Sequence, residues 1–103
     1  ILNAIQAQPG GGRILVSARP GPNGGNRVTV NVCDMGAGVR PEDREKIFQP
    51  FYTTRSDGTG LGLSVAQRLA EQNGAVLCLG QNDGWKTVFA LELQAARAGK
   101  AVK

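Results

Sequence analysis

The residues with the clearest chemical potential form the segment Asp34-Met35-Gly36-Ala37-Gly38, which directly follows an alternating apolar stretch. An ionised carboxylate only accepts hydrogen bonds, so Asp34 can accept one from an exocyclic amine such as that of adenine. Gly36 and Gly38 lack a Cβ atom, so a flat ring can lie against their backbone. Taken alone, the segment is explained equally well by an Asx-type turn.

Two other nucleotide motifs do not fit the chain. A dinucleotide-binding Gly-x-Gly-x-x-Gly would need a third glycine at position 41, where the chain has Pro41. A P-loop would need Gly-Lys followed by Ser or Thr, and this sequence does not occur. The segment at Asp34 is therefore predicted to bind a base rather than a pyrophosphate.

A second glycine-rich segment, Gly58-Thr59-Gly60-Leu61-Gly62-Leu63, leads into a predicted helix. Backbone N–H groups at the start of a helix are unpaired and lie at the positive end of its dipole, so they bind phosphate well. The alternative is a plain turn with Thr59 as the N-cap. Three alternating glycines cost more backbone entropy than a cap requires, and we therefore favour phosphate binding.

Two weaker signals flank these segments. The aromatic residues of Phe48-Gln49-Pro50-Phe51-Tyr52 can anchor a mobile loop, although by themselves they are better explained by core packing. The amide oxygen of Asn3, on the first predicted helix, is a hard ligand that suits Mg²⁺. A lone asparagine on a helix is usually solvated, so Asn3 gains meaning only beside the other segments.

Seven predicted elements must position these residues. Apolar residues recur at helical intervals in the first and third helices, with Gly74 placed to cap the latter, and Pro41 followed by Glu42 and Asp43 favours the start of the short second helix. Apolar residues alternate in three of the strands, and the strand at 75–79 is apolar throughout. The helices are predicted at residues 1–8, about 41–48 and 60–73, and the strands at 13–19, 27–34, 75–79 and 85–93. This order predicts an α+β domain, a two-layer α/β sandwich with helices on one face of a mixed, mostly antiparallel sheet.

Composition limits the class of protein. The 103 residues fit one domain, and the formal charge of +4 is carried by scattered residues without an aromatic stacking set, which argues against nucleic acid. No apolar run is long enough to span a membrane. Cys33 and Cys78 lack metal-type spacing and are predicted to be buried, reduced thiols of a cytoplasmic protein.

Four segments, in order, resemble the N, G1, F and G2 boxes of sensor histidine kinases. They are Asn3-Ala4-Ile5-Gln6-Ala7, Asp34-x-Gly36-x-Gly38, Phe48-x-Pro50-Phe51-x-Thr53-Thr54 and Gly58-Thr59-Gly60-Leu61-Gly62-Leu63. The resemblance implies the C-terminal catalytic and ATP-binding domain of these kinases, with the Bergerat fold of the GHKL ATPase superfamily. The domain would occupy residues 1–94, starting within the N box, and residues 95–103 would be a flexible tail.

The resemblance also implies roles for individual residues, with ATP and Mg²⁺ as cofactors. Asn3 would hold Mg²⁺ between the phosphates, and Asp34 would bond the adenine amine beside Gly36 and Gly38. Phe48 and Phe51 would flank an ATP lid at residues 53–58. The residues expected to approach the triphosphate are Thr59, Gly60, Leu61, Gly62 and Leu63.

The chain contains no histidine, so no catalytic residue is identifiable in it and the phospho-accepting histidine must lie elsewhere. The resemblance implies transfer of the ATP γ-phosphoryl group to a separate dimerisation domain, with a response regulator as the further partner. A non-catalytic nucleotide-binding or protein-interaction module on the same fold is the alternative. A topoisomerase- or chaperone-type ATPase is disfavoured by the short lid and the Phe-x-Pro-Phe segment.

The chain opens inside an apolar segment, and the first strand and helix of the resembled domain would precede Ile1. Without them, one face of the sheet would expose apolar surface. We therefore expect the chain alone to bind nucleotide weakly and to self-associate. Because it lacks the acceptor histidine, we also expect it to be inactive by itself.

Overall fold

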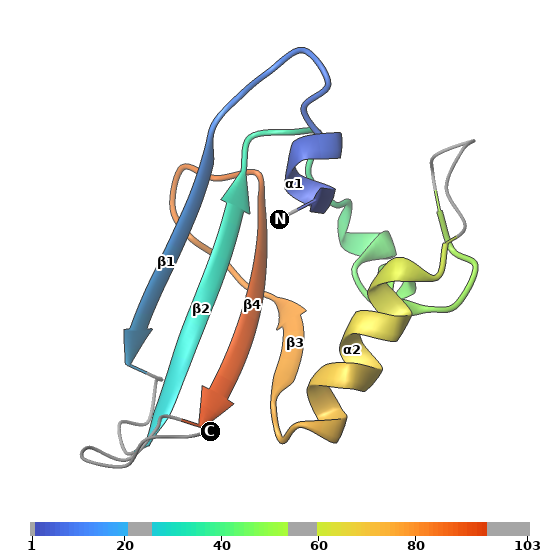
Figure 1. Cartoon of the computed structure of the whole chain (residues 1–103). Helices are drawn as coiled ribbons and strands as arrows, with labels where there is room; N and C mark the ends of the chain where they lie inside the picture. Colours follow the sequence, from blue (N-terminus) through green and yellow to red (C-terminus); the bar gives the residue numbers. More distant parts are fainter. Residues whose placement is uncertain (1, 21–25, 54–59, 95–103) are drawn as a thin grey trace.

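A computed structural model describes residues 2–20, 26–53 and 60–94, and shows a sheet beside a layer of helices (Figure 1). The elements in chain order are α1 (Leu2–Gln6), β1 (Ile14–Pro20), β2 (Arg27–Asp34), the 3-10 helices η1 (Pro41–Asp43) and η2 (Lys46–Phe48), α2 (Gly62–Gln72), β3 (Val76–Leu79) and β4 (Thr87–Gln94). The predicted two-layer α+β architecture is confirmed. None of the described helices is long and apolar enough to cross a membrane.

The four strands form one sheet in the order β1-β2-β4-β3. The predicted hairpin of the first two strands is confirmed, with Val16 opposite Val32. β4 lies between β2 and β3, and every pair of neighbours is antiparallel. The described part of the sheet is thus antiparallel throughout, where the sequence suggested a mixed one.

Alternation along the strands gives the sheet two different faces. Phe89 of β4 lies on the face toward the helices, where its ring meets that of Phe48 edge-on with the centroids 6.3 Å apart. Cys33, Val88 and Ala90 lie on the opposite face and are buried. The connection from β3 to β4 covers this second face, since Asn82 Nδ2 lies 3.7 Å from the sulfur of Cys33. The buried apolar residues of β2 and β4 therefore lie on the face away from the helices.

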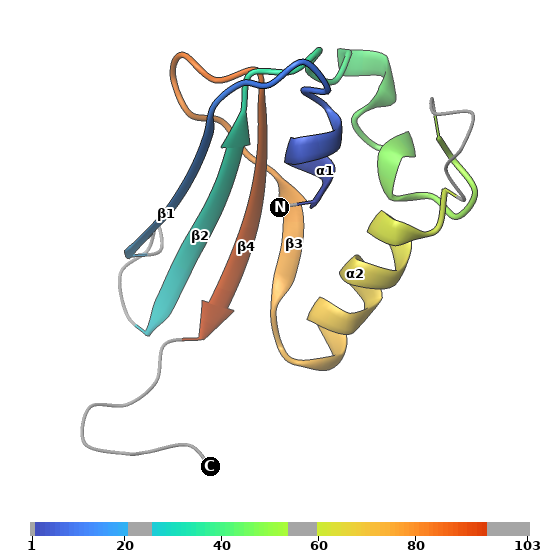
Figure 2. The ribbon, with the colours of Figure 1, turned by 45° about the horizontal axis from the view of Figure 1, so that its top comes forward.

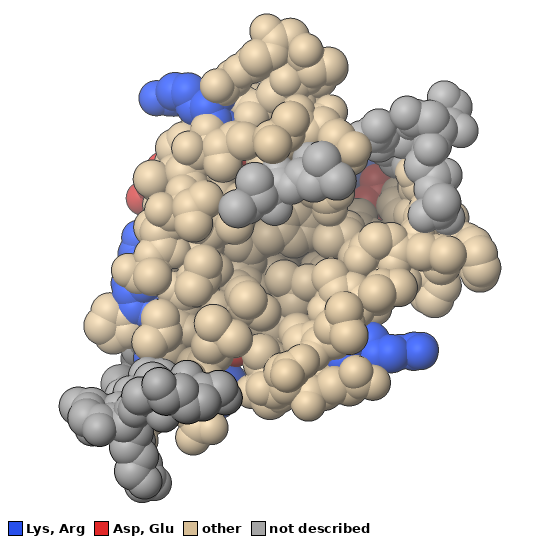
Figure 3. Space-filling view, viewed as in Figure 1, with Lys and Arg blue, Asp and Glu red and all other residues tan. Residues whose placement is uncertain are grey.

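The helical layer is packed more openly. α2 lies along β3, where Gln67 Nε2 donates to the carbonyl of Leu77 at 3.2 Å, but no described side chain of α2 is buried. Val65 and Leu69, from the apolar repeat of this helix, are 51% and 54% exposed. Figure 3 shows an uncharged, hollowed face between the sheet and α2. The repeat correctly predicted a helix, yet its apolar side chains remain at the surface.

Several boundaries and one burial prediction differ from the sequence analysis. The helix expected at 41–48 is two single 3-10 turns, η1 and η2, and the second ends at Gln49, which precedes Pro50 and is extended. α2 begins at Gly62, since Gly60 has a φ of +73°. β4 begins at Thr87 because the N–H of Trp85 closes a turn onto Asn82. Cys78 is exposed and only Cys33 is buried.

Candidate nucleotide-binding site

Asp34 ends β2 with a carboxylate that is almost fully buried, at 2% exposure. Its Oδ1 accepts the backbone N–H of Gly36 at 2.9 Å. This bond is the Asx-type turn that the sequence left open as an alternative. Among the described residues the carboxylate makes no other hydrogen bond, so Oδ2 keeps its capacity to accept one. The turn and an adenine contact are therefore compatible at this residue.

The two glycines after Asp34 allow the loop to be tightly enclosed. A Cβ atom on Gly36 would lie 2.7 Å from the carbonyl oxygen of Ala7, so any larger residue would push the loop away from α1. Gly38 has a φ of +80°, and a Cβ there would approach the carbonyl oxygen of Lys86 at 3.3 Å. We call residues 34–39 the adenine loop, after the ligand that the sequence predicts for it; it lies between α1 and the start of β4.

Gln8, which the sequence analysis did not single out, fixes the end of α1 to this loop. Its Oε1 accepts the backbone N–H of Met35 at 3.2 Å, and its Nε2 donates to the carbonyl of Arg13 at 3.0 Å. One side chain thereby joins α1, the start of β1 and the adenine loop. A polar residue at the end of a five-residue helix gives no distinctive sequence signal, which is why its role was missed.

Asn3 lies on the exposed side of α1, next to the buried Ala4. Its side chain makes no hydrogen bond to another described residue, so its amide oxygen can take a ligand. No group of three His, Cys, Asp or Glu side chains in the described ranges could hold a metal ion. A single amide oxygen fits Mg²⁺ that is held mainly by phosphate oxygens and water.

The two predicted aromatic anchors have different environments. Phe48 packs against Phe89 of the sheet, as the core-packing alternative predicted. Phe51 is 74% exposed and has a φ of +69°, a conformation that is strained for a residue other than glycine. Its N–H donates to the carbonyl of Gly60 at 2.7 Å, and a Cβ on Gly60 would collide with the backbone of Phe51. Phe51 and Gly60 are thus in direct backbone contact just before α2.

The start of α2 has no side-chain cap. Leu61 is the N-cap residue but provides no capping hydrogen bond, and the first turn contains no acidic residue. Gly62 is exposed, and a Cβ there would meet nothing within 4 Å, whereas Leu63 is half-buried. N–H groups at a helix start lie at the positive end of the helix dipole and suit an anion. Thr59 and the predicted lid from residue 54 onward lie outside the described residues.

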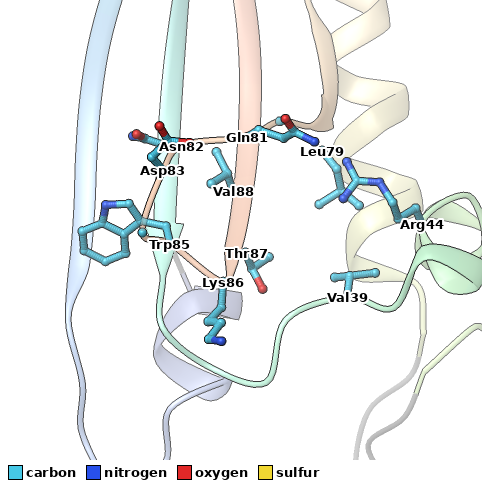
Figure 4. A pocket seen from close by; sticks show the side chains of 12 residues that line it. Val39, Arg44, Leu79, Gln81, Asn82, Asp83, Trp85, Lys86, Thr87 and Val88 are labelled. Atoms are coloured by element: carbon cyan, nitrogen blue, oxygen red, sulfur yellow. The ribbon is translucent and has the colours of Figure 1, made fainter.

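Thr87 is a site residue that the sequence analysis passed over. It is 8% exposed and directly opposite Asp34 in the pairing of β2 with β4. In Figure 4 its side chain points into the space that Val39 borders from the adenine loop. A threonine on the apolar face of an alternating strand was the available signal, because a hydroxyl buried there needs a polar partner.

A pocket of about 340 Å³ adjoins the adenine loop (Figure 4). Val39 and Arg44 line one side, and residues 79–88 line the other. None of the predicted site residues lines this pocket. The candidate nucleotide site is instead defined by Asp34, the adenine loop, α1 and the start of α2, and Figures 1 and 2 show both helices in the layer beside the sheet.

Comparison with known proteins identifies the family. Residues 1–97 match the family described as histidine kinase-, DNA gyrase B-, and HSP90-like ATPases. The chain belongs to this family. The sequence resemblance to sensor histidine kinases is thereby supported for nearly the whole chain.

Individual relatives agree with this family. The chain is 42% identical over 92 residues to the sensor histidine kinase ZraS of Salmonella typhi, covering 89% of this chain and 19% of that protein. It is 33% identical over 91 residues to sporulation kinase E of Bacillus subtilis, covering 88% of this chain and 12% of that protein. The chain thus spans about a fifth or less of these relatives.

Solved structures share both fold and sequence with the chain. Full-length ShkA in complex with AMPPNP superposes with a TM-score of 0.72 at 33% identity, covering 93% of this chain and 20% of that one. The catalytic domain of histidine kinase ThkA gives a TM-score of 0.74 at 33% identity, covering 90% of this chain and 59% of that one. The predicted fold, that of histidine kinase catalytic domains, is confirmed.

Proposed function

We propose that residues 1–94 act as the ATP-binding catalytic domain of a sensor histidine kinase. The observation that supports this most strongly is the buried carboxylate of Asp34, which has one oxygen bound to Gly36 and the other open to a further donor. A similar structure, that of ShkA, is a complex with AMPPNP. Family, fold and this acceptor together favour an adenine nucleotide as the ligand.

Asp34 would select the base by hydrogen-bond polarity. The exocyclic amine of adenine donates to a carboxylate, whereas guanine presents a carbonyl oxygen at the corresponding position, and two acceptors repel each other. Gly36 and Gly38 would let the ring lie against the loop, with Thr87 at its edge. A buried site built for a donor rejects ligands that lack one.

The triphosphate would lie toward the start of α2. Gly60, Gly62 and Leu63, with Leu61 between them, would present the phosphates with backbone N–H groups at the positive end of that helix, and Thr59 is the proposed side-chain contact. Mg²⁺, when bound, would neutralise charge on the phosphates, with Asn3 as its protein ligand. Phe48 anchors this region to the sheet, while Phe51 holds the chain next to Gly60.

The phosphoryl acceptor must come from outside the chain, which has no histidine. We therefore propose a dimerisation domain that carries the histidine, and a response regulator that receives the phosphoryl group from it. Dependence on ATP and the two free cysteines favour a cytoplasmic location.

The test is phosphoryl transfer in trans. The chain is incubated with γ-labelled ATP and the histidine-bearing dimerisation domain of its own protein. We expect label on that domain with the acid lability of phosphohistidine, and a loss of most of this label with the Asp34→Ala variant. Nucleotide binding without any transfer would contradict the kinase function and favour the non-catalytic module instead.

A further inference from the structure

A buried carboxylate lies between the two halves of the candidate site. Asp43 of η1 is only 8% exposed, and a buried aspartate needs partners. Arg40 Nε donates to Asp43 Oδ2 at 2.8 Å, and the Tyr52 hydroxyl lies beside the same carboxylate, where it helps to lower the pKa of Asp43. We call these three residues the Asp43 brace.

The three residues of the brace shift one another's pKa values. The hydrogen bond from Arg40 lowers the pKa of Asp43, and the bond from Tyr52 adds to this effect, while burial opposes it. Burial raises the pKa of Tyr52, and its bond to Asp43 raises this pKa further. Around neutral pH the carboxylate is therefore ionised and the phenol protonated, so Asp43 keeps both Arg40 and the Tyr52 hydroxyl as partners.

Each partner of Asp43 continues into a different half of the site. Arg40 directly follows the adenine loop that starts at Asp34. Tyr52 directly follows Phe51, which is bound to Gly60 just before α2. Asp43 thus connects the loop proposed for the base with the junction proposed for the phosphates. The adenine loop and the Phe51–Gly60 junction are separate segments of the chain. Their relative position therefore depends on contacts such as those of Asp43.

We propose that Asp43 is a positioning residue for nucleotide binding, which fixes the adenine loop relative to the Phe51–Gly60 junction. This inference rests on the proposed adenine-nucleotide function. A ligand that contacts both halves binds more tightly when the distance between them is already fixed, because binding then costs less conformational entropy. A ligand that touches only the adenine loop gains nothing from the brace.

The experiment compares adenosine with ADP on the full chain, titrated by NMR of the backbone amides. Asp43→Asn removes the charge and keeps the shape. We expect the Kd for ADP to rise about tenfold, with the Kd for adenosine changed less than about twofold. Tyr52→Phe removes one hydroxyl and should weaken ADP about threefold, and the double variant should bind ADP no more weakly than Asp43→Asn alone.

A matched control is the ion pair of Arg27 and Glu92, 2.6 Å apart and at the end of the sheet away from Asp34. Glu92→Gln should leave both Kd values unchanged. Equal weakening of adenosine and ADP by Asp43→Asn, or no change in either, would overturn the proposal. If Asp43→Asn does not fold, Tyr52→Phe decides by the same comparison. Absence of ADP binding by the unmodified chain would reject the proposed function itself, and the brace with it.

Discussion

Asp34 and Thr87 pair directly across β2 and β4, and both are buried at the same end of the sheet. The carboxylate and the hydroxyl thus form the polar end of an otherwise apolar face. We expect Thr87→Val, which keeps the β-branched shape, to weaken ADP binding by about 1 kcal/mol through loss of one hydrogen bond. Calorimetry measures this loss. An unchanged affinity would show that the hydroxyl does not contact the nucleotide.

Gly60→Ala is expected to destabilise the fold by about 2 kcal/mol or more, because the residue has a positive φ and its new Cβ would collide with Phe51. Gly62→Ala is the matched control, since a Cβ there meets open space at the start of a helix. It should be neutral or stabilise by up to about 1 kcal/mol. Urea unfolding distinguishes the two, and equal effects would refute the geometry at Gly60.

Acid unfolding should depend on Asp43. Its bond to Arg40 holds its pKa below the ordinary value of 3.8 in the folded protein. The contribution to stability is therefore complete above that value and is lost as the pH falls through the lower, folded pKa. The free energy of unfolding should decline from about pH 4 downward more steeply in the unmodified chain than in Asp43→Asn. Parallel curves would show that the carboxylate gains no net stabilisation from its partners.

The exposed apolar residues of α2 bear on the predicted self-association. Val65 and Leu69 leave apolar surface exposed on α2, and Figure 3 shows an uncharged, hollowed face between the sheet and this helix. A second copy of the chain can cover such apolar surface. We expect concentration-dependent association in sedimentation experiments, and a shift toward monomer with Leu69→Lys. Arg68→Ala, a change at a charged neighbour, is the control and should have little effect. A chain that stays monomeric at high concentration would contradict this prediction.

Much of the fold followed from local pattern. Strict alternation from Val28 to Val32 predicted β2 and its face, because a strand has a period of two. The order of the strands did not follow, since the insertion of β4 between β2 and β3 depends on contacts between distant segments. Pairing of Asp34 with Thr87 comes from that order, which explains why only the aspartate was predicted.

The special backbone of the candidate site was predictable where glycines mark it. Gly36 and Gly38 proved to be required by close approach and by a positive φ. Gln8 and Asp43 were missed, because their importance lies in which backbone and side-chain groups they reach. The choice between an Asx turn and a ligand at Asp34 also needed the structure, which shows that the turn occupies only one of its oxygens.

The most direct test of adenine recognition is calorimetric titration of the chain with ADP and GDP, before and after Asp34→Asn. This change keeps the shape and the acceptor for Gly36 but replaces the second oxygen with an amide donor. We predict that the unmodified chain binds ADP and not GDP, and that the variant loses about 1–3 kcal/mol of ADP binding, while the exposed control Asp83→Asn loses none. Equal binding of ADP and GDP, or undiminished ADP binding by Asp34→Asn, would contradict the account.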